Sequence, residues 1–256
     1  MASTTAFDRE RFAACYPPGI ERHYWTLARN RLIAHRLGRL RAQAPKALDC
    51  ILEIGCGRGI VVRALRREGF NAFGSDLAAP DGIPADVEHY LTLGADALAL
   101  PVEFRESVTT LLLLDVLEHI EDTEAFLAHC SNSFPRCRCL FVTVPARVEL
   151  WSNYDEYYGH FSRYTRSRLL TDTAPEGWRA RGAGYFFHAL YLAGMMQRLR
   201  GGKRSIRIKA PGPAARPAHA ALAAAFFREY KLLPDFIPGS SCWAEYVRTE
   251  QEPCTP

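Results

Sequence analysis

A glycine-rich turn after a short apolar segment constrains the fold of this chain more than any other feature. The segment Ile51–Ile54 carries Glu53 and is followed by glycines at positions 55, 57 and 59, after which a helix-like segment begins. Glycine adopts the left-handed backbone conformations that such a turn needs and leaves room for a ligand against the backbone. A buried strand that ends in this way and opens a helix is typical of α/β proteins that hold adenosine-containing cofactors.

The spacing of the glycines distinguishes between two kinds of cofactor site. The dinucleotide fingerprint G-x-G-x-x-G requires a glycine where this chain has Ile60, which disfavours a nicotinamide oxidoreductase. A second apolar segment, Asn71–Asp76, ends in a carboxylate about 20 residues after the turn, where α/β nucleotide-binding units hold the ribose hydroxyls. Asp76 alone is also compatible with a surface residue that caps a turn, but its register with the glycines favours the ribose role.

Two further segments follow in the same order along the chain. Gly94–Pro101 contains Asp96, and the continuous apolar stretch Ser107–Leu114 leads into Asp115–Ile120, which reads D-V-L-E-H-I. An apolar run of this kind predicts a strand that is buried on both faces. Strands that alternate with helical segments predict a parallel sheet.

In order and spacing, these four segments resemble the class I S-adenosylmethionine (SAM)-dependent methyltransferases. The E-x-G-x-G-x-G turn is similar to their motif I, and D-V-L-E-H-I is close to the phrase after strand four in the subgroup related to ubiquinone-biosynthesis methyltransferases. The resemblance implies that SAM is the cofactor and S-adenosylhomocysteine (SAH) the product, with Asp96 at the adenine amino group. It assigns cofactor binding to Glu53, Gly55, Cys56, Gly57, Gly59, Asp76, Leu77, Asp96, Ala97, Asp115 and Val116.

The resemblance also implies an α/β fold: a Rossmann-like, seven-stranded, mostly parallel sheet with helices on both faces and an antiparallel last strand. We expect one domain over residues 1–256, with a helical cover at 1–46, a cofactor-binding half at 47–145 and an acceptor-side half at 146–250 that holds a helical insertion at 185–233. The sequence pattern predicts helices at 7–44, 122–134, 185–199 and 220–233, strands at 139–144, 178–184 and 240–248, and a loop at 201–219.

Methyl transfer itself demands few catalytic side chains. The leaving group is neutral when it departs, so the protein aligns donor and acceptor, and a base is needed only where the acceptor loses a proton. Ligands in open α/β sheets bind beyond the carboxyl ends of the strands. Asp115 and His119, which share a face if their segment is helical, are therefore catalytic candidates. For His119 we favour the alternative that it orders the turn or supports the cofactor.

A second group of candidates follows the fifth strand. Residues 144–165 are similar to a W-S…D…G-H-x-R-R-Y-T block of these methyltransferases, with Ser162 in place of the first arginine. Histidine is the residue type whose ordinary pKa suits a base near neutral pH, so His160 is the candidate base. The favoured alternative is a polar brace in which His160 joins Asp155 and Arg163. The candidate substrate-binding residues are Trp151, Tyr154, Asp155, Tyr158, His160, Arg163 and Tyr164.

The apolar run at 185–199 is the segment that we expect to wall an acceptor pocket, with core packing or membrane contact as alternatives. A net charge of +4 does not predict a nucleic-acid partner. The sequence has no run of 18 apolar residues and no secretory signal, so we expect a cytoplasmic protein, without stable membrane insertion, that is a monomer or homodimer. The eight cysteines lack zinc-ligand spacing, so no metal is expected.

These observations predict an enzyme that methylates an N or O atom of a small molecule, in a setting compatible with specialised metabolism. Two alternatives stay open. One is a methyltransferase that acts on protein or RNA, which a contiguous charged groove around the cleft would indicate. The other is a non-catalytic SAM-binding partner subunit, which the intact cofactor segments disfavour.

Overall fold

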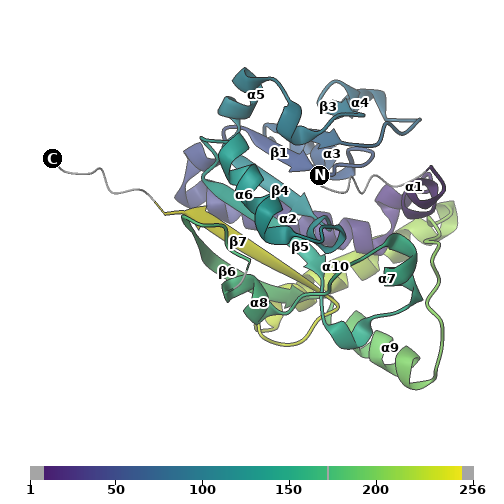
Figure 1. Cartoon of the computed structure of the whole chain (residues 1–256). Helices are drawn as coiled ribbons and strands as arrows, with labels where there is room; N and C mark the ends of the chain where they lie inside the picture. The colour runs from purple at the N-terminus through teal and green to yellow at the C-terminus, as the bar shows by residue number, and fades with distance from the viewer. Residues whose placement is uncertain (1–8, 172, 250–256) are drawn as a thin grey trace.

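A computed structural model describes residues 9–171 and 173–249 of the chain. A seven-stranded sheet lies at its centre with helices on both sides (Figure 1). The strands are β1 (Ile51–Ile54), β2 (Ala72–Asp76), β3 (Leu91–Leu93), β4 (Thr110–Leu114), β5 (Cys139–Pro145), β6 (Trp178–Phe186) and β7 (Ser241–Arg248). The helices are α1 (Arg9–Cys15), α2 (Tyr24–Gln43), α3 (Ile60–Arg67), α4 (Ala85–Glu88), α5 (Val102–Ser107), α6 (Thr123–Ser133), α7 (Asn153–Tyr158), α8 (Arg166–Thr171), α9 (His188–Leu199) and α10 (Arg216–Leu232).

The strand order is β3-β2-β1-β4-β5-β7-β6. β1 pairs in parallel with β2 and with β4, β2 with β3, and β4 with β5, whereas β7 is antiparallel to both β5 and β6. The predicted fold class, including the antiparallel last strand, is confirmed. The order reverses between β1 and β4, and open α/β sheets bind ligands beyond the carboxyl ends of the strands at such a switch point.

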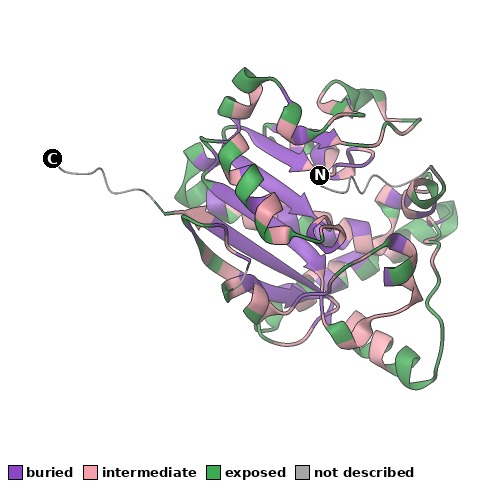
Figure 2. Ribbon diagram, in the orientation of Figure 1, coloured by how far each residue is buried: buried purple, intermediate pink, exposed green. Residues whose placement is uncertain are grey.

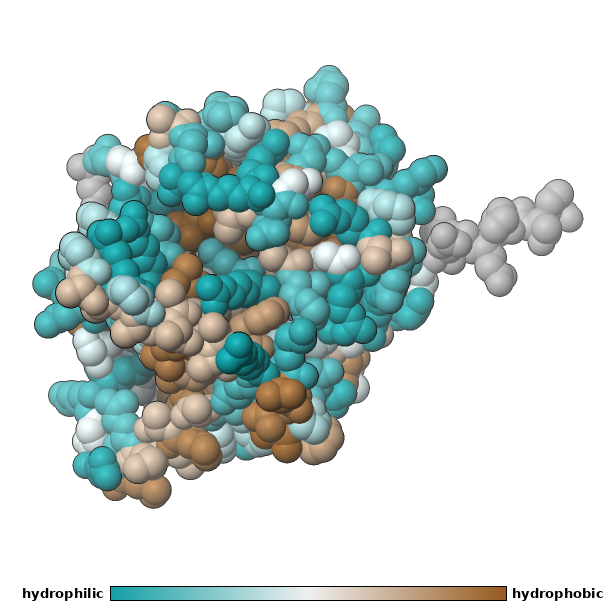
Figure 3. Space-filling view, turned by 180° about the vertical axis from the view of Figure 1, so that it is seen from behind, coloured by the Kyte–Doolittle hydropathy of each residue, from teal (hydrophilic) through white to brown (hydrophobic). Residues whose placement is uncertain are grey.

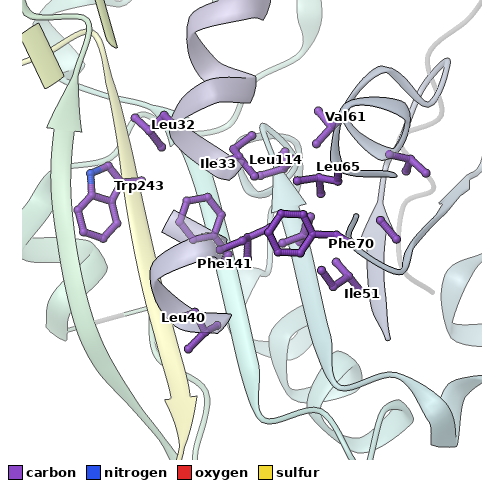
Figure 4. Packing of buried hydrophobic residues seen from close by; sticks show 14 of the residues in the cluster. Leu32, Ile33, Leu40, Ile51, Val61, Leu65, Phe70, Leu114, Phe141 and Trp243 are labelled. Carbon is purple, nitrogen blue, oxygen red and sulfur yellow. The ribbon is translucent and has the colours of Figure 1, made fainter. Parts of the chain in front are cut away.

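Alternate residues of each central strand pack into two separate cores. In β4, Leu112 and Leu114 join the core under α2, α3 and α10, whereas Leu111 and Leu113 join the core under α6 and α8. This alternation follows from the two-residue period of a strand, and burial on both faces explains why β4 is apolar throughout. Figure 2 shows the buried sheet between helices whose outer faces are exposed. In Figure 4, residues of α2 such as Leu32 and Ile33 pack beside Leu114 and Phe141 of the sheet.

Several predicted boundaries are wrong for local reasons. The helix expected over 7–44 is broken between α1 and α2, where the chain reads Pro17-Pro18-Gly19 and Gly19 has a φ of 88°. Residues 1–8 lie outside the described part. The fourth strand begins at Thr110, because the preceding residues to Ser107 close helix α5. Helix α10 begins at Arg216 rather than 220, since Pro217 is favourable in a first helical turn.

The run at 185–199 also differs from its prediction. Its first residues complete β6, and α9 begins at His188. Of the residues in α9 only His188 is buried, whereas Leu192, Met196 and Leu199 are exposed, so packing of the whole run into the core is excluded. On the molecular face seen in Figure 3, hydrophobic residues form separate patches among hydrophilic ones. None of the helices in residues 9–171 and 173–249 combines the length and hydropathy that a membrane crossing requires.

Candidate active site

The glycine turn between β1 and α3 contains three residues in the left-handed backbone conformation. Gly55, Gly57 and Gly59 have φ angles of 77°, 55° and 68°. A Cβ at position 57 would lie 2.7 Å from the ring of Tyr16, and one at position 59 would lie 2.6 Å from Leu91. Both the backbone conformation and the space around the turn therefore require glycine, as its role in a cofactor turn predicts.

Asp76, at the end of β2, holds the turn from the other side. Its Oδ2 accepts a hydrogen bond from the Gly57 amide at 2.7 Å, and its Oδ1 accepts one from the Ala78 amide at 2.8 Å. Burial raises the pKa of Asp76, although these two amides oppose the shift. Each carboxylate oxygen retains a second lone pair, so the side chain is still able to accept ribose hydroxyls. The neighbouring Leu77 is 42% exposed.

The other predicted cofactor residues line the same edge. Cys56 is buried behind the turn, and its amide donates to the Ser75 carbonyl. The Asp96 side chain caps a short 3-10 helix by accepting from the Leu98 amide at 2.9 Å. Ala97 is buried in that helix. Val116 packs against the glycine turn, because a Cβ at position 55 would lie 2.8 Å from its side chain.

A buried charge network that sequence reasoning missed links α2 to this edge. Arg29 forms an ion pair with Asp115 at the end of β4, and its guanidinium stacks over Trp25 at 4.6 Å. Glu53 is 3% exposed, and burial raises its pKa to about 8 although the Arg29 charge opposes the shift. One signal for Arg29 was present in the sequence, since this charged residue lies between Trp25 and Leu32 on the apolar stripe of the helix.

The N-terminal segment reaches the cofactor turn. The Tyr16 ring lies against Gly57, and Arg58 donates to the Tyr16 carbonyl at 3.4 Å. Burial raises the pKa of the Tyr16 hydroxyl well above its usual value and that of the neighbouring Cys15 thiol to about 12. This placement agrees with a helical cover over the cofactor, although that role for residues 1–46 stays a prediction.

The acceptor-side candidates form a brace around Asp155. Arg163 donates to both oxygens of this fully buried carboxylate, at 2.8 and 3.1 Å, and His160 Nδ1 lies 3.0 Å from Oδ1. Burial alone would raise the pKa of Asp155, but the hydrogen bonds from His160 and Arg163 outweigh it and hold the pKa well below its usual range. Arg163 also donates to the Ala146 carbonyl at 2.9 Å. The structure therefore contains the brace. The role of His160 as a base stays a prediction.

The aromatic candidates divide into buried and accessible residues. Tyr164 is fully buried and donates to the Leu117 carbonyl at 3.1 Å. Tyr158 is 3% exposed and donates to the Ile206 carbonyl at 2.8 Å. Trp151 and Tyr154 are half-buried, and the Arg204 guanidinium lies 4.2 Å from the Tyr154 ring. Acceptor contact by these residues stays a prediction, with Trp151 and Tyr154 the better placed for it.

The segment after β4 is not an α-helix, so Asp115 and His119 do not share a helical face. Asp115 has a φ of 58°, and Leu117–His119 form a 3-10 turn. Asp115 engages Arg29, whereas the His119 ring lies 4.7 Å from the His160 ring, edge to face. Burial, followed by the neighbouring His160, lowers the pKa of His119 to about 4.

Backbone strain marks the same edge of the sheet. The three non-glycine residues with positive φ in the described chain are Asp115, Arg147 and Phe187, at 58°, 68° and 60°. They follow the carboxyl ends of β4, β5 and β6. Strained conformations of this kind cluster at functional sites, so their shared location supports this edge as the site.

Comparison with known proteins identifies the family. The model of a methyltransferase-domain family matches residues 24–199, which is more than half of the chain. The chain belongs to this family. Residues 24–199 therefore form a class I SAM-dependent methyltransferase domain, which confirms the resemblance drawn from the four sequence segments.

Curated relatives of this methyltransferase are ubiquinone biosynthesis O-methyltransferases. That of Rhodopseudomonas palustris is 30% identical over 95 residues, which cover 34% of this chain and 38% of the relative. That of Sinorhizobium medicae is 31% identical over 109 residues, which cover 38% of this chain and 42% of the relative. These matches span only about two fifths of the relatives' own length.

Solved structures agree with the fold. The plantazolicin methyltransferase BamL, crystallised with a triazolic desmethylPZN analog and SAH, superposes with a TM-score of 0.53 at 11% identity and covers 94% of this chain and 89% of its own. A putative sarcosine dimethylglycine methyltransferase from Galdieria sulphuraria gives 0.51 at 12% identity, covering 88% and 86%. At these identities the likeness concerns the fold alone.

Proposed function

We propose that this methyltransferase transfers the methyl group of SAM to an oxygen atom of a small-molecule acceptor. In that reaction the S–CH3 bond of the sulfonium breaks, an O–CH3 bond forms, and the hydroxyl proton of the acceptor leaves to a base. The sulfonium becomes the neutral thioether of SAH, so no general acid is required. Alignment of donor and acceptor is the main contribution of the protein, and in favourable systems it reaches roughly 7–11 kcal/mol.

The observation that carries this proposal is the imidazole of His160 at the acceptor edge. Its Nδ1 is held at 3.0 Å by the fully buried Asp155, which leaves the opposite ring nitrogen for chemistry. An amine acceptor that reaches the site unprotonated needs no base during transfer, whereas a hydroxyl must lose its proton. A positioned proton-accepting group therefore favours oxygen over nitrogen. The naming of the curated relatives as O-methyltransferases supports the same choice.

The roles of the cofactor residues follow from their places along the edge. The glycine turn and Asp76 would hold the ribose, Asp96 with Ala97 the adenine, and the Arg29–Asp115 pair the end of the site next to β4. Trp151 and Tyr154 would contact a flat acceptor through their rings. A cytoplasmic location, the absence of a nucleic-acid partner and a monomeric or homodimeric state stay predictions.

A two-stage experiment tests the proposal. SAH binding to the purified chain is measured by calorimetry with NAD as control, and SAM with a labelled methyl group is then supplied with paired hydroxyl and amine acceptors. We expect SAH to bind, NAD not to bind, and label to enter hydroxyl compounds. Label that enters only amines would overturn the choice of oxygen, and NAD binding would overturn the cofactor assignment.

Substitution of His160 tests its role directly. His160→Ala is expected to lower kcat by at least about 100-fold, a typical contribution of a positioned base, while SAH affinity is unchanged. His129→Ala is the control, because His129 is an exposed residue of α6 and is not a member of the brace. Loss of SAH binding or of folding in His160→Ala, with Arg163→Lys equally affected, would assign His160 to the brace alone.

A further inference from the structure

Three side chains with metal-ligating atoms converge beside the acceptor edge. Glu118 and His119 come from the 3-10 turn after β4, and His160 comes from the loop after α7. One ligand atom from each of the three lies within 4.8 Å of the others. The Phe161 amide donates to the Glu118 carbonyl at 2.7 Å, so the two segments are tied together by their backbones.

Glu118 is the unusual member of this group. The residue is 1% exposed, and its Oε2 has no hydrogen-bond partner among the described residues. A buried carboxylate oxygen without a donor is costly, and native proteins rarely leave one so unless an ion or another ligand completes it.

Both imidazoles are held in the way that metal-ligating histidines are held. Asp155 accepts from Nδ1 of His160 and so leaves the lone pair on the opposite nitrogen. His119 hydrogen-bonds to the backbone at Tyr158 and Gly159. Partners of this kind orient a histidine ring toward a metal. The charges of Arg29 and Arg163 are already balanced by Asp115 and Asp155, so they do not repel a cation at full strength.

From this geometry we propose that Glu118, His119 and His160 bind one divalent transition-metal cation, a site that the cysteine pattern of the sequence did not suggest. Ligand distances of about 2.0–2.2 Å place ligand atoms about 3–4 Å apart, so the three side chains need to close by only about 1 Å. Two imidazoles and one carboxylate suit zinc, manganese or ferrous iron, and three protein ligands leave coordination positions open. Resting on the proposed function, the metal replaces the direct base role of His160, because one ring nitrogen cannot both bind the cation and accept a proton. An acceptor oxygen in an open position would have a more acidic hydroxyl, whose proton would leave to solvent.

Metal binding is measured on the full chain after treatment with EDTA. Calorimetric titration with Zn²⁺ and with Mn²⁺ is expected to show one equivalent bound. Pulsed electron paramagnetic resonance of the Mn²⁺ form is expected to show nitrogen couplings from imidazole. Glu118→Gln and His119→Ala are each expected to weaken binding at least tenfold, whereas the exposed-histidine control His129→Ala leaves it unchanged.

The spectrum of the wild-type Mn²⁺ form tests metal binding even if a variant fails to fold. Absence of bound cation, absence of nitrogen couplings, or affinity unchanged by Glu118→Gln would each overturn the metal site. The proposed function is tested separately, by SAH binding and by methyl transfer measured both without and with EDTA. Full turnover of hydroxyl acceptors in EDTA would support methyl transfer to oxygen and would show that the metal takes no part in the reaction.

Discussion

At the level of single residues, the cofactor turn depends on conformations that other amino acids adopt only under strain. Gly57 combines a φ of 55° with a Cβ position that lies 2.7 Å from the Tyr16 ring. Gly69, after α3, has a φ of 77° but open space around its Cβ position among the described residues. Substitution of Gly69 therefore measures the free-energy cost of backbone strain alone, whereas substitution of Gly57 adds a steric clash at the site.

We expect Gly57→Ala to lower SAH affinity at least tenfold, because the new methyl group displaces Tyr16 and shifts the turn. Gly69→Ala is expected to cost about 1 kcal/mol of stability through strain alone and to leave SAH affinity unchanged. Calorimetric SAH titration and denaturant unfolding measure the two effects. Equal SAH affinity in the two variants would contradict this account of the turn.

Glu53 gives the protein a specific pH dependence. Its folded-state pKa of about 8 lies above the unfolded value of 4.5, so between these pH values the folded state holds more protons than the unfolded state. The contribution of Glu53 to stability therefore falls as pH rises from about 4.5 to 8. Glu53→Gln removes the titration, and we expect the difference in unfolding free energy between variant and wild type to grow in favour of the variant across this window. A constant difference between pH 5 and 8 would refute the assignment.

At the level of secondary-structure elements, the short helix α7 owes its position to its first turn. Ser152 and Asp155 form a capping box, in which the Ser152 hydroxyl accepts from the backbone and the Ser152 amide donates to Asp155 at 2.9 Å. The same Asp155 binds Arg163 and His160. A helix cap and the acceptor-side brace therefore share one carboxylate, so a change in the cap alters the site.

This sharing predicts that two cap substitutions differ in their effect on activity. Ser152→Ala and Asp122→Ala each remove an N-cap, the latter from α6, and each is expected to cost about 1 kcal/mol of stability. Only Ser152→Ala is expected to change kcat or KM, because only its cap contacts the brace. Kinetics on both variants test this, and a change that appears equally in Asp122→Ala would show that general destabilisation is the cause.

At the level of the whole molecule, the N-terminal helical part is anchored to the last strand. Arg36 of α2 makes two hydrogen bonds of 2.7 Å to Glu245 of β7, and its guanidinium lies 3.8 Å from the Trp243 ring. The Glu245 side chain is 6% exposed. The helix that carries Arg29 to the site is therefore held against the sheet by a contact between residues 209 positions apart in the sequence.

Arg36→Met leaves a buried carboxylate unpaired and is expected to cost about 3 kcal/mol of stability. The double variant Arg36→Met/Glu245→Gln is expected to recover part of this loss, because no uncompensated charge remains. Arg63→Met, at the exposed pair with Asp86, serves as a control and is expected to change stability little. Unfolding by denaturant measures these three variants and Glu245→Gln alone, and additive effects of the two substitutions would contradict the pairing.

The sequence by itself determined the parts of this protein whose signals are local. Each strand could be predicted from its own residues, because burial and turn geometry act on neighbouring residues. The signals were the glycine turn after β1, the carboxylate at the end of β2, and the apolar runs of β4 and β5. Their order along the chain then implied the parallel sheet and the cofactor edge. The brace of His160, Asp155 and Arg163 was also predictable, since its members lie within one short segment.

Only the tertiary structure decided which distant residues meet. Arg29 pairs with Asp115 across 86 positions, and Tyr16, just before the Pro17-Pro18-Gly19 break, contacts Gly57. No local pattern encodes either contact. The convergence of Glu118 and His119 with His160 likewise depends on how two loops pack beyond β4 and β5. Such contacts depend on the packing of whole elements, whereas sequence periodicity reports only which face of each element is buried.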